Sequence, residues 1–276
     1  MIDATLLRKM IGAVLTTAGI DHAAVEADAI VKAAGQRNPS NVLAAAVEAA
    51  RQRVVTFPKL PGRTLFMGVP LSVLPGVLVL RDETELLGYS ALAVLSDIAG
   101  PALVIDMCCG AGNLACALAM LQPSTRVWAA DLTDAAVGAT RANVERLQLG
   151  DRVTVVQGDL FAPLASLDLE GRIDAIVCNP PYISTGKLEK ERTDLLIDEP
   201  REAFDGGPYG VSIFQRVLRD AVPFLRPGGR LLFEIGAGQG RQVTSLFARN
   251  GQYEPVDTRA DHDAVPRVVI GRKRTP

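Results

Sequence analysis

The 276-residue sequence has few of the residues on which several common chemistries depend. Its only two histidines, His22 and His262, lie in the first segment and near the far end, where neither indicates a proton relay. Its four cysteines lack the paired short spacings of a zinc site, so we expect no bound metal. The 29 lysines and arginines against 31 acidic residues give no basic field, so we do not expect a nucleic-acid partner.

Long apolar runs, internal repeats and low-complexity segments are also lacking. No run is long enough to span a membrane, so we expect no membrane association. Each cysteine lies in an apolar segment, which is typical of buried, reduced thiols in a cytoplasmic protein. The hydrophobic content of 48% and charged content of 22% are those of a globular protein with a buried core. The sequence leaves the oligomeric state open.

The pattern of apolar residues divides the chain into three segments. Residues 1–56 are rich in alanine with apolar residues at helical spacing, which predicts an N-terminal helical domain. Residues 57–84 place glycine and proline between short β-rich runs, which predicts a linker and a β-hairpin. Residues 85–276 alternate helical and strand patterns. This alternation predicts an α/β, Rossmann-like fold with a mainly parallel seven-stranded sheet and helices on both faces.

The third segment can be divided into individual elements by its hydrophobic periodicity. We expect helices at residues 85–98, 113–121, 134–147, 212–225 and 241–250. We expect strands at residues 102–106, 126–131, 152–157, 174–178, 230–235, 253–258 and 267–271. A charged excursion at residues 184–208 interrupts the alternation. Because ligands bind at the carboxyl ends of strands in such sheets, the loops that follow the strands are candidate sites.

The first of these loops has features of a nucleotide-like binding site. In "VIDMCCGAGNLACA" a strand ends at Asp106, and Gly110 and Gly112 precede a helix. Glycines let backbone N–H groups approach a ligand closely, and the helix start adds a positive dipole end. Asp131 closes the next strand, "RVWAAD", where a carboxylate can accept both hydroxyls of a ribose.

Two classes of ligand remain open for this loop. The stretch "GAGNLA" satisfies a dinucleotide fingerprint, so an NAD-dependent oxidoreductase is one interpretation, although no Tyr/Lys or His/Asp catalytic pair is evident. S-adenosylmethionine is the other, because its positive amino group suits Asp106, whereas a pyrophosphate would be repelled by that carboxylate. In "VVQGDLF", Asp159 stands where it could accept a hydrogen bond from an adenine amino group.

A second feature is the end of the stretch "DAIVCNPPYIS", where an apolar strand runs into Asn179-Pro180-Pro181-Tyr182. Two consecutive prolines cannot continue a ladder, because neither has an N–H to donate. With "VIDMCCGAGNLACALA", "AADLTDAAVGATRANVERL", "GDLF", "EPREAFDGGPYG" and "LLFEIGAGQG", this stretch resembles class I methyltransferases of the HemK type. The hairpin segment "MGVPLSVLPGVLVLRDETELL" is also similar to that family's link into its catalytic domain.

The resemblance implies methyl transfer from S-adenosylmethionine to the side-chain amide of glutamine in peptide-chain release factors. A glutamine nitrogen is a poor nucleophile, so acceptors must hold its N–H bonds and aim its lone pair. The Asn179 side-chain oxygen and the Pro180 backbone oxygen would be those acceptors, and Pro181 would stiffen the turn. Tyr182 would pack on the amide plane or near the sulfonium. The proton can leave to water afterwards.

The resemblance also implies two sets of binding residues. S-adenosylmethionine would be held by Thr84, Glu85, Asp106, Cys108, Gly110, Gly112, Asn113, Asp131, Leu132, Asp159, Leu160 and Asn179. The substrate would contact Tyr182, Glu199, Pro200, Gly206 and Gly207, four of which belong to the excursion. Glu234 and Gly236 would support the end of the sheet.

The sequence departs from the family pattern at several positions. Asp82 replaces a proline, and Cys108 replaces a common glycine, a change that is tolerable if the backbone there keeps negative φ. Tyr209 replaces an aspartate, and residues 52–64 lack the usual Gly-x-Pro and Tyr-Ile-x-Gly run. These changes concern mainly the substrate side. Methyl transfer to nitrogen is therefore better supported than the acceptor, and a small amide- or amine-bearing metabolite or a DNA or RNA base remains an alternative.

Overall fold

The computed structural model describes residues 63–72, 74, 76–78, 80, 81, 83–196 and 199–275, and the isolated positions 8, 9, 11, 12, 27 and 31. The six isolated positions are helical. Most of the expected N-terminal helical domain, Asp82 and most of residues 52–64 lie outside the described residues. Among the described residues no helix combines the length and the apolar character that crossing a membrane requires.

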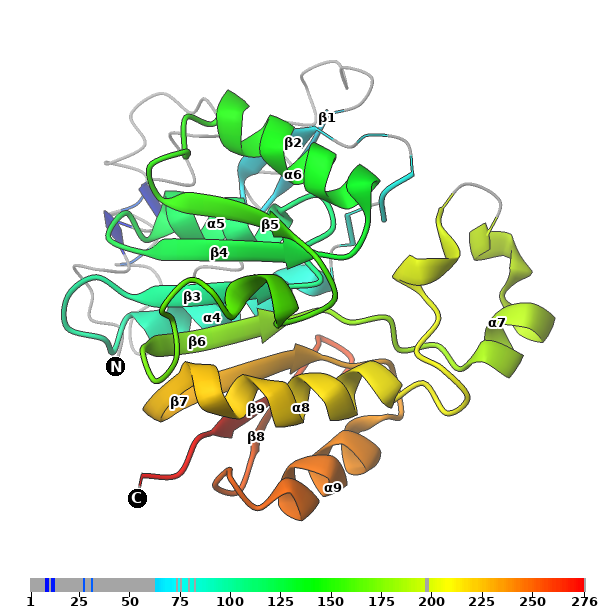
Figure 1. The fold of residues 1–276 in the computed structure, drawn as a ribbon. Helices are drawn as coiled ribbons and strands as arrows, with labels where there is room; N and C mark the ends of the chain where they lie inside the picture. The colour runs from blue at the N-terminus through cyan, green and yellow to red at the C-terminus, as the bar shows by residue number, and fades with distance from the viewer. Residues whose placement is uncertain are drawn as a thin grey trace.

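A seven-stranded sheet organises the described part of the chain (Figure 1). Its strands are β3 (Leu103–Met107), β4 (Arg126–Asp131), β5 (Val153–Gln157), β6 (Ile173–Cys178), β7 (Leu225–Glu234), β8 (Asp257–Ala260) and β9 (Pro266–Arg272). They lie in the order β5-β4-β3-β6-β7-β9-β8. The first five are parallel, whereas β9 runs antiparallel to both β7 and β8. The predicted α/β fold with a mainly parallel sheet is confirmed.

Helices cover both faces of the sheet, as predicted (Figure 1). One face carries α4 (Thr84–Leu95), α5 (Asn113–Leu121) and α6 (Asp134–Arg146), and the other carries α8 (Ser212–Phe224) and α9 (Gly240–Asn250). The remaining short helices are η1 (Ala162–Leu164), α7 (Thr185–Glu191), η2 (Thr193–Leu196) and η3 (Arg201–Ala203). The last three form the charged excursion, which projects to one side of the molecule in Figure 1.

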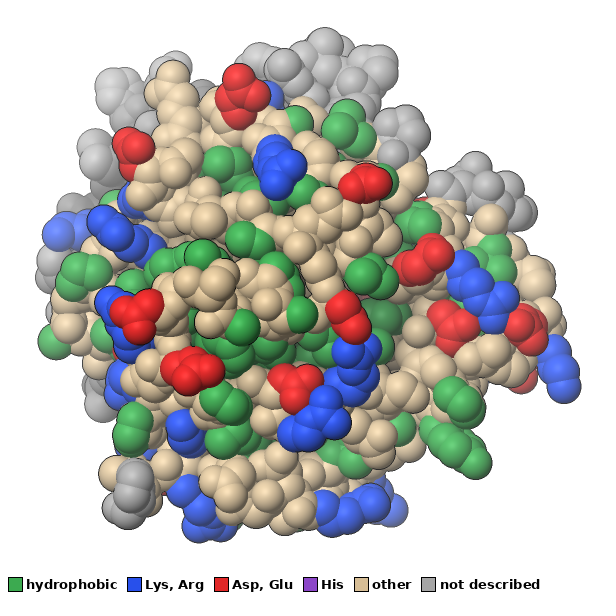
Figure 2. All heavy atoms as spheres, in the orientation of Figure 1, with side chains coloured by type: hydrophobic (Ala, Val, Ile, Leu, Met, Phe, Trp, Pro, Cys, Tyr) green, Lys and Arg blue, Asp and Glu red, His purple; other side chains and the backbone are tan. Residues whose placement is uncertain are grey.

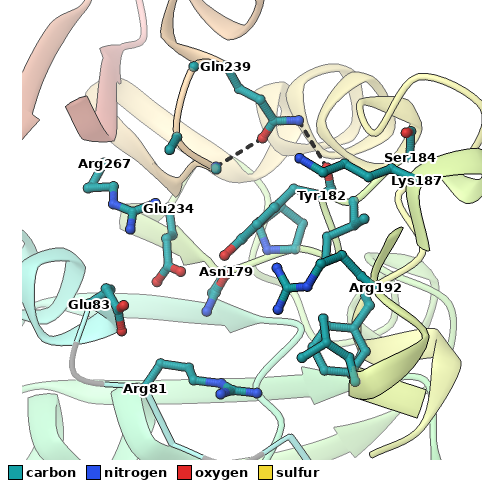
Figure 3. A pocket seen from close by; sticks show the side chains of 18 of the residues that line it. Arg81, Glu83, Asn179, Tyr182, Ser184, Lys187, Arg192, Glu234, Gln239 and Arg267 are labelled. Atoms are coloured by element: carbon teal, nitrogen blue, oxygen red, sulfur yellow. Dashed lines mark hydrogen bonds between the residues drawn. The ribbon is translucent and has the colours of Figure 1, made fainter. Parts of the chain in front are cut away.

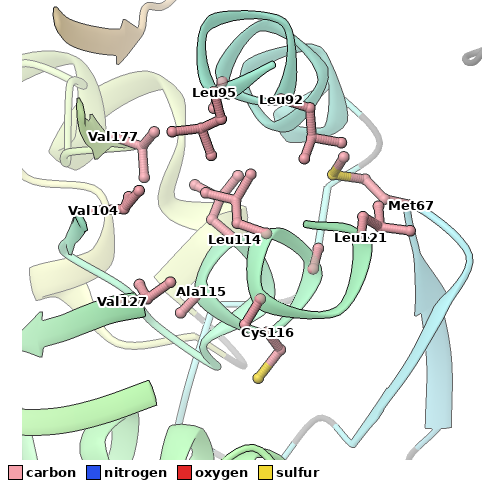
Figure 4. Packing of buried hydrophobic residues seen from close by; sticks show 14 of the residues in the cluster. Met67, Leu92, Leu95, Val104, Leu114, Ala115, Cys116, Leu121, Val127 and Val177 are labelled. Carbon is pink, nitrogen blue, oxygen red and sulfur yellow. The ribbon is translucent and has the colours of Figure 1, made fainter. Parts of the chain in front are cut away.

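The central strands are apolar on both faces because each face meets a layer of helices. Val104 and Val177 pack with Leu92, Leu95 and Leu114 of α4 and α5 (Figure 4). The strand neighbours of these valines point the other way, since side chains alternate along a strand. Those neighbours join the second cluster beneath α8 and α9 and include Ile105, Ile176 and Cys178.

A β-hairpin precedes the sheet domain, as predicted. Strands β1 (Arg63–Phe66) and β2 (Val69–Ser72) pair antiparallel, and Met67 and Gly68 form the two-residue turn between them. Both turn residues have positive φ, at 51° and 79°, which is the backbone of a type I′ turn. The backbone N–H of Met67 donates to Oε1 of Glu85 over 2.7 Å, so α4 holds the turn in place.

Two strands differ from the prediction by more than one residue. β7 begins at Leu225, ahead of residue 230, because Leu225 pairs with Ile173 before a register shift in the ladder. The strand expected at residues 253–258 is wrong in position: β8 is Asp257–Ala260, and Tyr253 makes only an isolated bridge to Lys273.

Charged side chains on the face shown in Figure 2 are of both signs and are interspersed. Over the described residues of that face, Lys and Arg do not gather into a single patch. This distribution agrees with the near balance of charge in the sequence.

Candidate functional site

Two large cavities meet at the carboxyl ends of the parallel strands. The glycine-loop cavity, of about 430 Å³, is lined by the loops that follow β3, β4 and β5. The excursion cavity, of about 640 Å³, lies between the ends of β6 and β7, the excursion and the segment before α4. Asn179, which follows β6 directly, lines both cavities, as do Leu78 and Ala203. Asn179 therefore stands at their junction.

The loop after β3 turns through two glycines with positive φ. Gly110 has φ 56° and Gly112 has φ 74°, a region that L side chains rarely adopt. The carbonyl oxygen of Gly110 accepts a 2.9 Å hydrogen bond from the Thr140 hydroxyl. A Cβ on Gly112 would lie 2.6 Å from Cγ2 of the same threonine. The close approach of α6 thus requires glycine at this position.

Cys108 has a strained backbone in this loop. Its φ is 60°, so the condition of a negative φ, under which cysteine would replace glycine without strain, is not met. The left-handed backbone expected of glycine is kept although the side chain is not glycine, at a cost of about 1 kcal/mol or more. The loop holds this conformation because the N–H of Cys109 donates to the Ala130 carbonyl over 3.1 Å. The Cys108 side chain lines the glycine-loop cavity.

Asp131, at the end of β4, joins two loops around the same cavity. Its Oδ2 accepts from the Gly110 N–H at 3.0 Å, and its Oδ1 accepts from the Thr133 N–H at 3.2 Å. Burial raises the pKa of Asp131, and these hydrogen bonds partly offset the rise. The carboxylate lines the cavity and has lone pairs to spare for a ligand hydroxyl.

Away from the glycine loop, the wall of this cavity contains apolar side chains and, beyond them, an ion pair. Leu132 and Leu160 form part of the wall, and Leu132 is 56% exposed. Asp159, after β5, pairs with Arg216 of α8 over 2.7 Å, and both side chains line the cavity.

Asp106 and Glu85 lie apart from both large cavities. Oδ2 of Asp106 accepts from the Ala115 N–H at 2.9 Å, which ties β3 to α5, and its Oδ1 is buried without a hydrogen-bond partner. Burial raises the pKa of Asp106 to about 8. Glu85 faces the hairpin turn at Met67. Asn113 and Thr84 line a small third cavity of about 30 Å³ beside the glycine loop, together with Asn179.

The glycine-loop cavity fits S-adenosylmethionine in the chemistry of its lining. It offers a carboxylate at Asp131 for ribose hydroxyls, apolar walls for an adenine ring and the carboxylate of Asp159 beyond them.

The side-chain amide of Asn179 lines the excursion cavity, and a hydrogen bond fixes its orientation (Figure 3). Its Nδ2 donates to the Thr84 hydroxyl oxygen at 3.1 Å, and in this orientation Oδ1 is left as the acceptor. Pro180 lines the excursion cavity, whereas Pro181 lines the glycine-loop cavity. The turn therefore presents one residue to each side of the junction.

Tyr182 lines the excursion cavity and is held in place by Gln239 and Gly236 (Figure 3). Its carbonyl oxygen accepts from Nε2 of Gln239 at 2.9 Å. Its ring packs on Gly236, where a Cβ would lie 3.0 Å from Cδ2 of the tyrosine. Burial, with a smaller contribution from the charge of Glu234, raises the pKa of Tyr182 to about 12.

Charged residues absent from the predicted site also line the excursion cavity. They are Arg81, Glu83, Lys187, Arg192, Glu234 and Arg267. Glu234 is 3% exposed, and burial raises its pKa to about 7, while the nearby charge of Arg267 lowers it. Gln239 was also missed, although it stands in the quoted stretch "LLFEIGAGQG". These residues come from distant segments that only the sheet topology brings together.

The four predicted substrate residues of the excursion lie in different surroundings, and none of them lines the excursion cavity. Glu199 pairs with Arg81 over 2.6 Å, and Pro200 lines the glycine-loop cavity. Gly206 and Gly207 line neither large cavity. A Cβ on Gly206 would lie 2.8 Å from the Pro181 carbonyl oxygen, and one on Gly207 would lie 2.3 Å from the Ser212 hydroxyl oxygen. These glycines allow the base of the excursion to pack against the Asn-Pro-Pro-Tyr turn.

Known proteins resemble this chain in sequence and in fold. Residues 90–209 match the family model "Methyltransferase small domain". The release factor glutamine methyltransferase of Gloeobacter violaceus is 35% identical over 209 residues, covering 76% of this chain and 71% of the relative. That of Moorella thermoacetica is 37% identical over 215 residues, covering 78% and 74%. A methyltransferase structure from Pyrococcus furiosus has a TM-score of 0.54 at 18% identity, covers 82% of this chain and 100% of its own, and supports the fold.

These matches decide between the two ligand classes that the glycine loop left open. The chain is a methyltransferase that uses S-adenosylmethionine, and not an NAD-dependent oxidoreductase. The resemblance stated from the sequence is confirmed, and the chain belongs to the family of release factor glutamine methyltransferases.

Proposed function

We propose that this enzyme methylates the side-chain nitrogen of a glutamine in a peptide-chain release factor. The names of its relatives support this acceptor, since they are release factor glutamine methyltransferases. The observation that carries the proposal is the position of Asn179, an oriented amide at the junction of the two cavities.

The glycine-loop cavity is assigned to the cofactor, which supplies an electrophilic methyl group on a positively charged sulfur. Asp131 binds the ribose hydroxyls, and the backbone of Gly110 lies along the ligand, while Gly112 lets the loop pack against α6. Leu132 and Leu160 enclose the adenine, and Asp159 accepts from its amino group. Arg216 holds Asp159 in place for this contact.

The excursion cavity is assigned to the acceptor. Oδ1 of Asn179 and the carbonyl oxygen of Pro180 accept the two N–H bonds of the glutamine amide. Both oxygens belong to a turn stiffened by Pro181, so little freedom is lost when the substrate binds. The Tyr182 ring packs on the amide plane. After transfer the extra proton on nitrogen leaves to water.

The remaining assignments concern segments around the site. Residues 85–276 are proposed as the catalytic domain, while most of the helical and linker segments expected at residues 1–62 lie outside the described residues. The excursion forms the wall against which the protein substrate docks, and its Lys187 and Arg192, with Tyr209 just beyond it, line the excursion cavity. Glu199, Pro200, Gly206 and Gly207 support this wall from outside that cavity. The Arg81–Glu199 ion pair supports this arrangement, since it joins the excursion to the segment before α4.

Mass spectrometry of methylated release factor tests the proposal. The enzyme and S-adenosylmethionine are incubated with a purified bacterial release factor, and the digest is searched for a mass gain of one methyl. We expect the methyl on one glutamine, and no product with a release factor in which that glutamine is replaced by alanine. Parallel arms contain a lysate metabolite fraction, free glutamine and DNA or RNA oligonucleotides. Labelling of one of these arms, with no label on the release factor, would contradict the proposed acceptor.

A further inference from the structure

Tyr209 stands at the tip of a turn beside the excursion cavity. The Gly210 N–H donates to the Gly207 carbonyl oxygen over 3.1 Å, which closes a β-turn with Pro208 and Tyr209 at its two central positions. Tyr209 has no positive φ and glycine follows it, as in a type I turn with proline at the second position. Because proline fixes one of the turn's backbone angles, the direction in which the backbone presents Tyr209 is well defined.

Hydrogen bonds attach both ends of this turn to neighbouring parts of the site. The Gly207 carbonyl oxygen also accepts from the Thr185 N–H at 3.0 Å. The Gly210 carbonyl oxygen accepts from Nε2 of Gln239 at 3.2 Å, and the same nitrogen donates to the Tyr182 carbonyl oxygen (Figure 3). A Cβ on Gly210 would lie 2.4 Å from that carbonyl oxygen. The turn that carries Tyr209 therefore packs directly on the backbone of the Asn-Pro-Pro-Tyr turn.

The Tyr209 side chain itself has no partner in the part of the chain that the structure describes. It is 79% exposed, more than any other large apolar side chain described. Its ring stacks on none of the other described aromatic rings, and it lines the excursion cavity. An aromatic ring on a well-fixed backbone loses little conformational freedom when it binds a ligand. Tyr209 is thus suited to contact whatever occupies the cavity.

The excursion cavity is larger than a glutamine side chain requires. Its volume of about 640 Å³ is in the range of sites that hold whole drug-sized ligands. A glutamine within a polypeptide brings its backbone and the adjoining residues with it, and these occupy the remaining space. Tyrosine is common at protein interfaces because its ring packs on apolar surface while its hydroxyl stays in water. A flanking stretch of polypeptide is therefore the chemistry that fits this ring.

We propose that Tyr209 is a specificity-determining residue: its ring packs against the polypeptide beside the acceptor glutamine, and so favours a protein-bound glutamine over a free one. This inference rests on the proposed function and deepens it. It supplies a physical basis for choosing a protein acceptor over a small metabolite, since a free metabolite has no flanking chain to contact. It also gives a role to a tyrosine that stands where the family pattern has an aspartate.

The kinetic test compares two acceptors, release factor and N-acetylglutamine amide, which has no flanking residues. We expect Tyr209→Ala to raise KM for release factor about 10-fold or more, as truncation of an aromatic anchor does, with kcat within about threefold. Its rate on the small amide should stay within about twofold of the wild type. Tyr209→Phe keeps the ring, so its KM for release factor should stay within about threefold. Leu167→Ala, at an exposed apolar residue that lines neither large cavity, is the control.

A cross-linking measurement tests the contact itself, which a purely structural role of the turn would not produce. The photoreactive amino acid p-benzoylphenylalanine is placed at position 209, and the enzyme is irradiated with release factor and S-adenosylhomocysteine. We expect cross-links to residues adjoining the methylated glutamine, located by mass spectrometry. Circular dichroism checks that each variant is folded. Affinity for S-adenosylhomocysteine should stay within about threefold in Tyr209→Ala, because this residue does not line the glycine-loop cavity.

The outcomes separate this inference from the proposed function. A wild-type KM for release factor in Tyr209→Ala, or cross-links only far in sequence from the methylated glutamine, would overturn the role of Tyr209 and leave the acceptor standing. An equal loss on both acceptors would do the same, since it indicates general damage to the site. A wild-type enzyme that leaves release factor unmethylated would overturn the proposed function, and this inference with it.

Discussion

The side-chain amide of Gln239 donates to the carbonyl oxygen of Tyr182 over 2.9 Å, which ties the loop after β7 to the Asn-Pro-Pro-Tyr turn. The same nitrogen reaches the Gly210 carbonyl at 3.2 Å, and the amide oxygen accepts from the Gly236 N–H at 2.9 Å. One side chain therefore holds three loops that converge on the excursion cavity. Its position ahead of α9 makes it a structural brace for the acceptor side.

Replacing Gln239 with leucine should weaken acceptor use selectively. The three hydrogen bonds disappear, the Tyr182 backbone is released, and a misplacement near 1 Å can lower the rate by about 100-fold. We expect kcat/KM for release factor to fall by about 10- to 100-fold with unchanged affinity for S-adenosylhomocysteine. The matched control is Gln242→Leu, an exposed glutamine in the first turn of α9. Equal kinetics for the two variants would remove Gln239 from the account.

Gly112 and Gly138 offer a matched pair of glycine-to-alanine changes. Gly112 has φ 74° and no room beside Thr140, so alanine there should cost at least about 1–2 kcal/mol of unfolding free energy and weaken cofactor binding. Gly138 lies in α6, where a Cβ would meet no atom within 4 Å, so alanine should stabilise by about 0.5–1 kcal/mol. Urea unfolding measures both. A Gly112→Ala variant as stable as the wild type would contradict the packing described for the glycine loop.

Asp106 should make the protein less stable as the pH rises. Its folded-state pKa is about 8, above the ordinary 3.8, so between these values the folded state binds a proton that the unfolded state has released. Unfolding free energy therefore falls with increasing pH, by about 1.4 kcal/mol per unit for one such group. Asp106→Asn keeps an acceptor for the Ala115 N–H and removes the titration. Urea unfolding at pH 5.5 and pH 8 should show a shallower decline in the variant; an identical decline would show that Asp106 does not carry the effect.

Asp131 should govern cofactor affinity. Asp131→Ala removes the carboxylate assigned to the ribose and also the acceptor for the Gly110 N–H. We expect affinity for S-adenosylhomocysteine to fall on the order of 10- to 100-fold by calorimetry. Asp134→Ala, an exposed acid nearby on α6, is the control and should bind within about threefold of the wild type. Comparable losses in both variants would point to a general electrostatic effect.

The fold followed from local patterns in the sequence. Strand β4 and helix α5 coincide with the predicted ranges, because both are apolar, Gly112 precedes the helix and Asp131 ends the strand. Strand β7 was harder, since Pro227 and Gly228 look like a break. Its first residue nevertheless pairs with β6 before the register shift.

The site was only partly predictable for a different reason. Asn179 and Asp131 could be found because each directly follows or ends an apolar strand, where ligands bind. The direction of a buried side chain does not follow from the sequence, so Glu85 was assigned to the cofactor although it holds the hairpin turn. Contacts between distant segments, such as Gln239 with Tyr182, depend on sheet order and were likewise hidden.

The central claim is that Oδ1 of Asn179 holds the acceptor nitrogen in line with the methyl group. The most direct measurement is the rate of release factor methylation by Asn179→Ala at saturating S-adenosylmethionine. We predict a loss of about 100-fold or more, since one of two positioning acceptors is gone. A rate within about threefold of the wild type would contradict the claim.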